Sequence, residues 1–205
     1  MKLAVLTLTA VFLLNLAGCA PPTHEDLYQN LEQFISNISM YYCIADMYVG
    51  KGENKTHYLI KQWYMLPDKY RLEILLPGDM TGKTIVKNGN TVWIDNPRLN
   101  EFYQLENIDL YIEDKIFPGS FLQCFMEGEA GTREVVTIGD GQYILLETHV
   151  PGLNKNFRRQ RLWIDARQMV PYMLKVYDNT EEAVIEVRYR DFSQDINMDI
   201  QLFER

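Results

Sequence analysis

The segment Lys69–Leu76, with the sequence Lys-Tyr-Arg-Leu-Glu-Ile-Leu-Leu, alternates between apolar and charged side chains. The two sets are Tyr70, Leu72, Ile74 and Leu76 against Lys69, Arg71 and Glu73. Successive side chains of a β-strand point to opposite faces, so this pattern is typical of a strand with one buried and one solvated face. Strands of that kind form antiparallel sheets that pack a single face on the core.

The same period returns near the C-terminus, where Ala183, Ile185, Val187 and Tyr189 alternate with Glu186, Arg188 and Arg190. Between these two segments, and before them, short apolar runs are separated by residues that favour turns. We predict strands at 40–49, 56–66, 69–76, 82–87, 91–95, 100–105, 133–138, 142–150, 157–165, 170–177 and 183–191. The intervening turns include 50–54, 88–90, 139–141, 151–152 and 178–179.

Two helical segments interrupt this succession of strands. Thr23 can cap a helix that has Glu25 and Asp26 in its first turn, and its apolar stripe consists of Leu27, Leu31, Phe34, Ile35 and Ile38. Residues 107–127 are expected to be helical in two pieces, divided at Pro118-Gly119, with an apolar face in the second piece. The predicted fold is therefore mostly β (α+β): a curved antiparallel sheet or open half-barrel, covered by an N-terminal helix and a helical insertion.

The first residues resemble a secretory signal peptide, because Met1-Lys2 is followed by an apolar run from Leu3 to Leu14 and then by small residues. The segment Leu16-Ala17-Gly18-Cys19 resembles the bacterial lipobox, which is cut before a cysteine whose thiol then carries a diacylglycerol. The alternative is a transmembrane anchor. The apolar run is shorter than the ~20 residues that a membrane span needs, however, and Pro21-Pro22 would end a helix just after it.

We therefore expect a signal peptide over 1–18, a lipidated tether over 19–23 and one domain over 24–205. Lipidation at Cys19 would anchor the protein at the extracytoplasmic face of a bacterial membrane. The chain has 20 basic and 28 acidic residues and a net charge of −8. An acidic surface repels nucleic acid, so a nucleic-acid partner is not expected.

With Cys19 lipidated, Cys43 and Cys124 would remain as an even pair in a compartment that permits disulfides. A bridge between them would join the first strand to the helical insertion. The alternative is that each is a small buried apolar residue, which is common for free cysteine. The spacing of the two residues leaves both alternatives open.

No common catalytic motif is present: the sequence has no Gly-x-Ser-x-Gly, His-Glu-x-x-His, phosphate-binding glycine loop or Ser-x-x-Lys. His24, His57 and His149 have no metal-ligand spacing to the cysteines, and the paired carboxylates lie in predicted turns. We therefore expect no catalytic residue, no metal, no cofactor and no enzymatic activity.

Two sets of side chains are candidates for binding. The aromatic residues Trp63, Tyr64, Trp93, Phe121 and Phe125 would either line an apolar cavity or fill it as core. Arg158, Arg159 and Arg161 stand out against the acidic background. They would form either a patch for an acidic partner or a solvated strand face paired with acidic neighbours.

Several motifs occur in the order of a known superfamily. They are Leu66–Glu73, Ile85–Pro97, Leu162–Asp165 followed by Pro171 and Tyr177-Asp178, and Tyr189–Phe192 through Ile196-Asn197 to Leu202-Phe203. Together they resemble the LolA/LolB-like lipoprotein carriers, whose fold is an open β-barrel with helices in its mouth. The lipobox and the turn at Pro151–Asn154 resemble most the GerS-type germination lipoproteins of spore-forming Firmicutes.

The resemblance implies two different functions. A GerS-type protein would be a non-catalytic partner or activator of a CwlD-like cell-wall amidase in the spore cortex. A LolB-type protein would instead carry lipid or lipoprotein acyl chains in a hydrophobic cavity, although the polar segment Asn96–Asn100 is short for its protruding apolar loop. The sequence leaves a monomer and a homodimer equally open.

Overall fold

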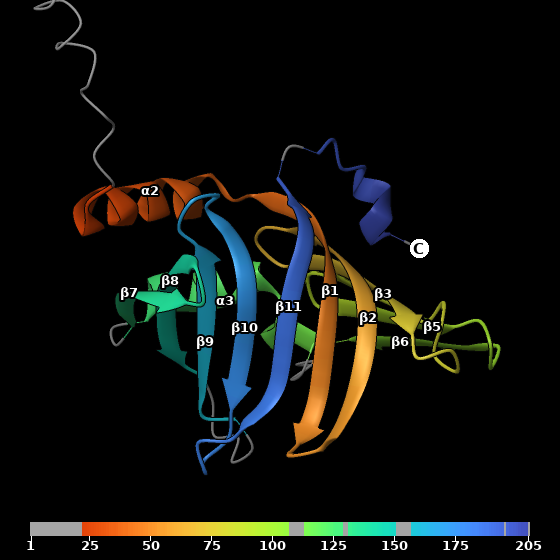
Figure 1. Cartoon of the computed structure of the whole chain (residues 1–205). Coiled ribbons are helices and arrows are strands. Elements are labelled where there is room, and N and C mark those ends of the chain that lie inside the picture. Colours follow the sequence, from red (N-terminus) through yellow and green to blue (C-terminus); the bar gives the residue numbers. More distant parts are fainter. Residues whose placement is uncertain (1–21, 107–112, 129–130, 151–156, 195, 205) are drawn as a thin grey trace, which may run out of the picture.

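The computed structural model describes residues 22–106, 113–128, 131–150, 157–194 and 196–204 (Figure 1). The expected lipidation site, Cys19, and the turn at 151–154 lie outside these residues. The helices are α2 (His24–Asn37), η1 (Glu113–Ile116), α3 (Pro118–Glu127) and η2 (Ile200–Phe203). The strands are β1 (Met40–Lys51), β2 (Asn54–Met65), β3 (Lys69–Leu76), β4 (Thr84–Asn88), β5 (Thr91–Asn96), β6 (Glu101–Glu106), β7 (Thr132–Ile138), β8 (Gly141–His149), β9 (Arg159–Asp165), β10 (Val170–Tyr177) and β11 (Ala183–Ser193).

All eleven strands belong to one antiparallel sheet with the order β6-β5-β4-β3-β2-β1-β11-β10-β9-β8-β7. The chain enters at the centre, with β1, and passes strand by strand to the edge at β6. It then crosses to the opposite edge at β7 through η1 and α3, and it returns to β11, which pairs with β1. The sheet stays open between its edges, so the predicted open, curved antiparallel sheet is confirmed.

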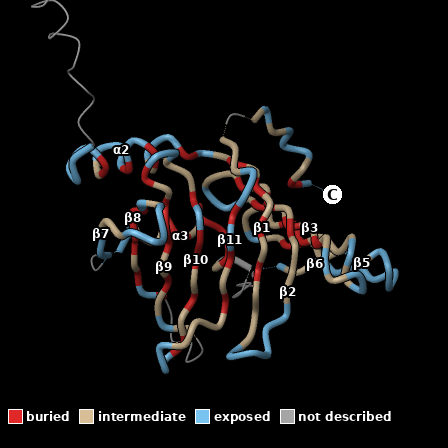
Figure 2. Tube along the Cα trace, viewed as in Figure 1, coloured by how far each residue is buried: buried red, intermediate tan, exposed pale blue. Residues whose placement is uncertain are grey.

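The sheet curves around the helical insertion, and α3 lies behind β9 and β10 in Figure 1. Inward-facing residues alternate with outward-facing residues along most strands, as the buried and partly exposed positions of β1 and β3 show. Figure 2 shows buried residues along β9, β10 and β11, on the strands that face the insertion. The main core therefore lies in the concavity of the sheet, between the strands and the helices.

The N-terminal helix α2 begins where the sequence predicts. Thr23 and Asp26 form a capping box, in which the Asp26 N–H donates to Thr23 Oγ1 (3.2 Å) and the Thr23 N–H donates to the Asp26 carboxylate (2.8 Å). Its inward face buries Leu27, Leu31 and Phe34. Among the described residues, no helix is both long enough and apolar enough to cross a membrane.

The C-terminal segment covers part of the outer face of the sheet, which the sequence analysis does not predict. The carbonyl oxygen of Phe203 accepts a hydrogen bond from Asn88 Nδ2 (3.3 Å), and that of Leu202 accepts one from Arg71 Nη1 (3.5 Å). Phe203 is fully buried there. Short 3₁₀ turns of this kind have no hydrophobic period long enough to stand out in a sequence.

A buried carboxylate joins two hairpins at one end of the sheet. Asp178 follows β10, and its Oδ1 accepts from the Thr180 N–H (2.8 Å), the Thr180 hydroxyl (2.7 Å) and the Glu182 N–H (3.1 Å). Its Oδ2 accepts from Lys51 at the end of β1. Hydrogen bonds to the Asp178 carboxylate hold its pKa well below the usual value, and the bond from Lys51 has the largest effect, with that from Thr180 next.

This lowered pKa predicts a stability that depends on pH. A carboxyl group with a lowered folded-state pKa stabilises the fold above its unfolded pKa of ~3.9, and the stabilisation is lost as the pH falls below that value. Asp178→Asn should therefore be less stable than wild type at pH 7, and the difference should shrink at pH 3. Urea unfolding at both pH values measures it, with the exposed turn variant Asp140→Asn as the control. An equal deficit at both pH values would contradict the prediction.

Candidate functional site

The concavity of the sheet is bound to the chain's own insertion by buried side chains. The carbonyl oxygen of Ile116 accepts two hydrogen bonds, from Gln62 Nε2 (3.1 Å) and from the Tyr189 hydroxyl (2.9 Å). A third bond joins Gln160 Nε2 to the carbonyl oxygen of Lys115 (2.9 Å). Three strands that are far apart in the sequence, β2, β9 and β11, thus each donate a hydrogen bond to the end of η1.

The start of α3 is held as closely. The Gly119 N–H donates to the Tyr41 hydroxyl of β1 (3.2 Å), and the Tyr64 hydroxyl of β2 donates to Gln123 Oε1 (2.8 Å). Tyr41 and Tyr64 stack with their ring centroids 5.2 Å apart. A β-carbon on Gly119 would lie 2.2 Å from the Tyr64 ring, so only glycine allows the helix to approach the sheet this closely.

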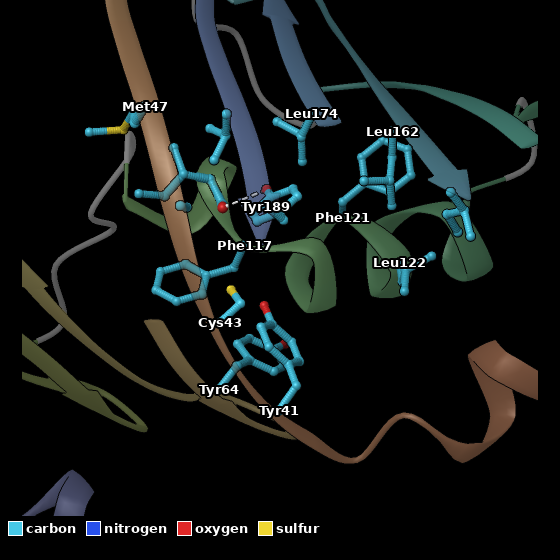
Figure 3. Packing of buried hydrophobic residues seen from close by; sticks show 14 of the residues in the cluster. Tyr41, Cys43, Met47, Tyr64, Phe117, Phe121, Leu122, Leu162, Leu174 and Tyr189 are labelled. Atoms are coloured by element: carbon cyan, nitrogen blue, oxygen red, sulfur yellow. Dashed lines mark hydrogen bonds between the residues drawn. The ribbon is translucent and has the colours of Figure 1, made fainter. Parts of the chain in front are cut away.

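Apolar side chains of the insertion fill the remaining space. Phe117 and Phe121 are completely or almost completely buried, as are Ile116 and Leu122. The Phe117 ring stacks on Tyr70 of β3, with the centroids 4.5 Å apart. Figure 3 shows Phe117, Phe121 and Leu122 pointing from the insertion into the cluster of side chains that the strands provide. The concave face is therefore a packed core across these elements.

The polar groups in this core stay neutral. Burial raises the pKa of the Tyr41 and Tyr189 hydroxyls well above their usual value, and it also raises the pKa of the Cys43 thiol. The Cys43 thiol donates to Gln62 Oε1 (3.4 Å). A protonated thiol is a poor nucleophile and a poor metal ligand. These groups thus position the insertion by hydrogen bonding.

The predicted disulfide between Cys43 and Cys124 is not formed: both residues are thiols in the structure. Cys43 lies on β1 in the core, where its thiol is directed to Gln62. Cys124 is half-buried on α3, whose buried side chains belong to Pro118, Gly119, Phe121 and Leu122. Cys43 therefore fits the alternative that the sequence left open, a small apolar residue buried in the core.

The structure divides the five aromatic residues predicted to line or fill a cavity. Tyr64 and Phe121 are buried in the concave core, and Phe125 packs against it. Trp63 and Trp93 lie on the outer face, so their placement in a cavity is wrong. Trp63 contacts Tyr42 of β1 (5.3 Å between ring centroids), and Trp93 Nε1 donates to Gln104 of β6 (3.3 Å).

The three arginines on and next to β9 lie on the outer face among acidic neighbours. Arg161 Nε donates to Glu147 Oε2 (2.5 Å), and Arg159 Nη1 donates to the same atom (3.3 Å). Glu181 pairs with Arg159 and with Arg158 Nη1 (3.5 Å). Two carboxylates therefore pair with three guanidinium groups. This arrangement fits the second alternative from the sequence analysis, a strand face whose arginines pair with acidic neighbours.

One apolar groove stays open beside the filled core. It lies between the C-terminal half of α2, the end of β2 and α3, with a volume of about 280 Å³. Its apolar walls are Ile35, Ile38, Leu66, Gly119, Leu122 and Met126, and its polar residues are Glu32, Ser36, Gln123 and Glu127. Met126 is 65% exposed. This groove has mainly apolar walls and room for part of an apolar ligand.

One histidine of the described residues contacts a carboxylate. His57 Nε2 lies 2.8 Å from Asp46 Oδ1 on the outer face, and its ring stacks on Tyr48. In the described ranges, no three residues of the types His, Cys, Asp and Glu come together in a way that could hold a metal ion.

The sequence analysis does not predict the residues that hold the insertion: Gln62, Gln160, Tyr41 and Tyr189. A signal for two of them is present, however. Gln62 lies between Ile60 and Tyr64 on the inward face of β2, and Gln160 lies two residues before the inward Leu162 of β9. A buried polar side chain needs a hydrogen-bond partner, so an amide on an apolar strand face indicates a segment packed against it.

One family of known proteins matches nearly the whole chain. The model of the YdcC-like sporulation proteins covers residues 1–203. The chain belongs to the YdcC-like sporulation protein family. A curated relative, sporulation protein YdcC of Bacillus subtilis (strain 168), is 22% identical over 99% of this chain. The chain spans 60% of the length of that relative.

Two solved structures of similar proteins bear on the fold and its relatives. One is the CwlD amidase from Clostridioides difficile in complex with the GerS lipoprotein (28% identity, 85% of this chain, 97% of the matched chain, TM-score 0.50). The other is an uncharacterized conserved protein from Thermus thermophilus (14% identity, 87% of this chain, 93% of the matched chain, TM-score 0.56). The family match and the similarity to the complex that contains GerS confirm the predicted resemblance to GerS-type proteins.

Proposed function

We propose that this member of the family is a non-catalytic, lipid-anchored partner and activator of a cell-wall N-acetylmuramoyl-L-alanine amidase in sporulation. It would act at the extracytoplasmic face of the membrane, held by a lipid on Cys19. The observation that carries the proposal is the similarity to the GerS lipoprotein, which was solved in complex with the CwlD amidase. A CwlD-like amidase is therefore the partner that we infer for this chain.

The filled concavity supports binding at the surface over carriage in the interior. A carrier of acyl chains needs an apolar chamber of several hundred Å³. Here the insertion occupies the concave face, and its backbone is tied to strands β1, β2, β9 and β11. Emptying that space would break these hydrogen bonds and leave buried polar groups without partners, which is costly.

Capture of the protein from the membranes of sporulating cells tests this function. We expect an amidase of the CwlD type to be recovered with it, and we expect the purified amidase to cleave peptidoglycan faster when this protein is added. A LolA superfamily protein of unrelated function is the control for binding through the fold alone. Recovery of stoichiometric lipid without an amidase would contradict the proposal.

The groove beside α2 and α3 favours a second candidate, carriage of a single acyl chain. Its walls are mainly apolar, and about 280 Å³ is enough for part of such a chain. Mass spectrometry of an organic extract of the folded protein distinguishes the candidates. Leu122 lies on the wall, and Leu122→Trp should expel a bound acyl chain if the groove holds one.

A further inference from the structure

The edge strand β6 is open to pairing along its whole length. Its six residues pair with β5 in one continuous register, from Thr91 opposite Glu106 to Asn96 opposite Glu101. The sheet order ends at β6, and no strand of the described residues pairs with its other side. Along this strand only Leu105 is shielded to an intermediate degree, and the other five residues are exposed. An edge of this kind presents backbone N–H and C=O groups to another chain.

Three of the common protections of an edge strand are missing from β6. Such strands are commonly protected by lysine, proline or a β-bulge, and Glu101–Glu106 contains neither residue and shows no shift in register. The aromatic Tyr103 is 49% exposed instead. The other edge, β7, is different because Arg133 reaches α2, where it pairs with Glu32 (2.9 Å) and lies over the Tyr28 ring (4.4 Å).

The charge of β6 indicates the chemistry of its partner. Glu101 and Glu106 lie at the two ends of the strand, and no ion pair within the described residues involves either of them. They are an odd number of positions apart, so they point to opposite faces of the sheet. An added strand would match them with one basic residue near each end, because opposite charges across neighbouring strands attract.

A second copy of this chain fits the edge poorly. If two β6 strands paired in antiparallel fashion about a twofold axis at the strand centre, each Glu101 would lie opposite the partner copy's Glu106. Like charges directly opposite one another destabilise a strand pair. The complementary occupant is therefore a different protein with a basic extended segment.

We infer that the amidase docks by adding an extended segment to β6, with two basic residues placed against Glu101 and Glu106 and apolar residues beside Tyr103. This inference rests on the proposed function, since it names the surface through which that partner would bind. Main-chain hydrogen bonds would provide the affinity, and the two carboxylates would select the partner.

Binding of a purified CwlD-type amidase tests the docking site. The double variant Glu101→Lys/Glu106→Lys should bind about tenfold more weakly than wild type, because two attractive cross-strand pairs become repulsive. The matched control, Glu53→Lys/Asp140→Lys, makes the same change in net charge at two exposed turns and should bind like wild type. Equal weakening by both variants would show an effect of overall charge and would overturn the inference.

Hydrogen exchange of the complex gives a second, independent measurement. Backbone amides within 101–106 should exchange more slowly when the amidase is bound to the wild-type protein. If the amidase binds without protecting β6, the docking inference fails and the proposed function stands. If wild-type protein does not bind the amidase, both fail. Protection of β6 in the absence of amidase, together with a dimer in sedimentation, would show that a second copy covers the edge and would overturn the inference.

Discussion

Phe121→Ala should lower the free energy of unfolding by about 3–5 kcal/mol, which is the range for removing a large aromatic side chain from a core. Phe121 is 1% exposed and belongs to the cluster that joins α3 to the strands. Its replacement would leave a cavity at the point where the insertion meets the sheet. Urea denaturation followed by circular dichroism, with linear extrapolation to water, measures the loss.

The matched control for this variant is Trp93→Ala, which removes a larger aromatic side chain from the outer face. Trp93 is half-buried there, and its neighbour Val92 is the residue of β5 that is fully buried in the core. Its loss should therefore destabilise the protein much less than the loss of Phe121. Equal effects of the two substitutions would mean that the insertion does not form the core of the sheet.

The same pair of variants separates stability from binding. Trp93→Ala should leave the protein folded. Any change in amidase binding by this variant would then come from the loss of the hydrogen bond between Trp93 and Gln104 of β6. Phe121→Ala should reduce binding in proportion to the loss of folded protein. A Phe121 variant that stays folded but takes up stoichiometric lipid would instead support a carrier whose chamber the insertion normally fills.

Cys19→Ala should abolish the proposed lipidation completely, since the lipid would be attached through the cysteine thiol. Metabolic labelling with a fatty acid should mark the wild-type protein and leave the variant unmarked, and the variant should lose its attachment to the membrane. Cys124→Ala serves as the control, because it removes a thiol of the folded domain and should leave the label in place. Equal labelling of wild type and Cys19→Ala would remove the lipid anchor from the proposal.

Loss of the anchor should also alter the proposed activation. A lipid anchor would confine the protein to the membrane surface and would raise its effective concentration near an amidase that acts at the same surface. Cys19→Ala should therefore weaken activation in cells while leaving the binding of the purified domain unchanged. A parallel loss of binding in solution would indicate that the N-terminal segment contributes to the interface directly.

Much of the fold follows from local patterns in the sequence. The alternation in Lys69–Leu76 produces a strand with a single buried face because its odd positions are mainly charged. Thr23 and Asp26 fix the start of α2 by their mutual hydrogen bonds. Pro118 divides the insertion because proline is favoured at the first turn of a helix and disfavoured further inside it. These features depend on neighbours within a few residues.

The placement of the aromatic residues needed the tertiary structure. Trp63 and Tyr64 are adjacent, and Trp93 lies between Val92 and Ile94, so apolar side chains occur on both faces of these strands. The alternation of side chains then assigns these residues to two faces of the sheet, but it does not determine which face points into the core. The insertion decides it, since Phe117 and Phe121 cover the face that carries Tyr64 and not the face that carries Trp63.

The state of the charged and polar groups was decided in the same way. The sequence identifies Arg159 and Arg161 as a basic cluster, but strand β8 brings Glu147 beside them from a separate part of the chain. The sequence likewise shows Gln62 on an apolar strand, but it does not show that Gln62 donates a hydrogen bond to the carbonyl oxygen of Ile116 on the insertion. Sequence patterns determine which residues share a face of one strand. The pairing of strands and the packing of the insertion determine what those residues contact, because both depend on contacts between residues far apart in the chain.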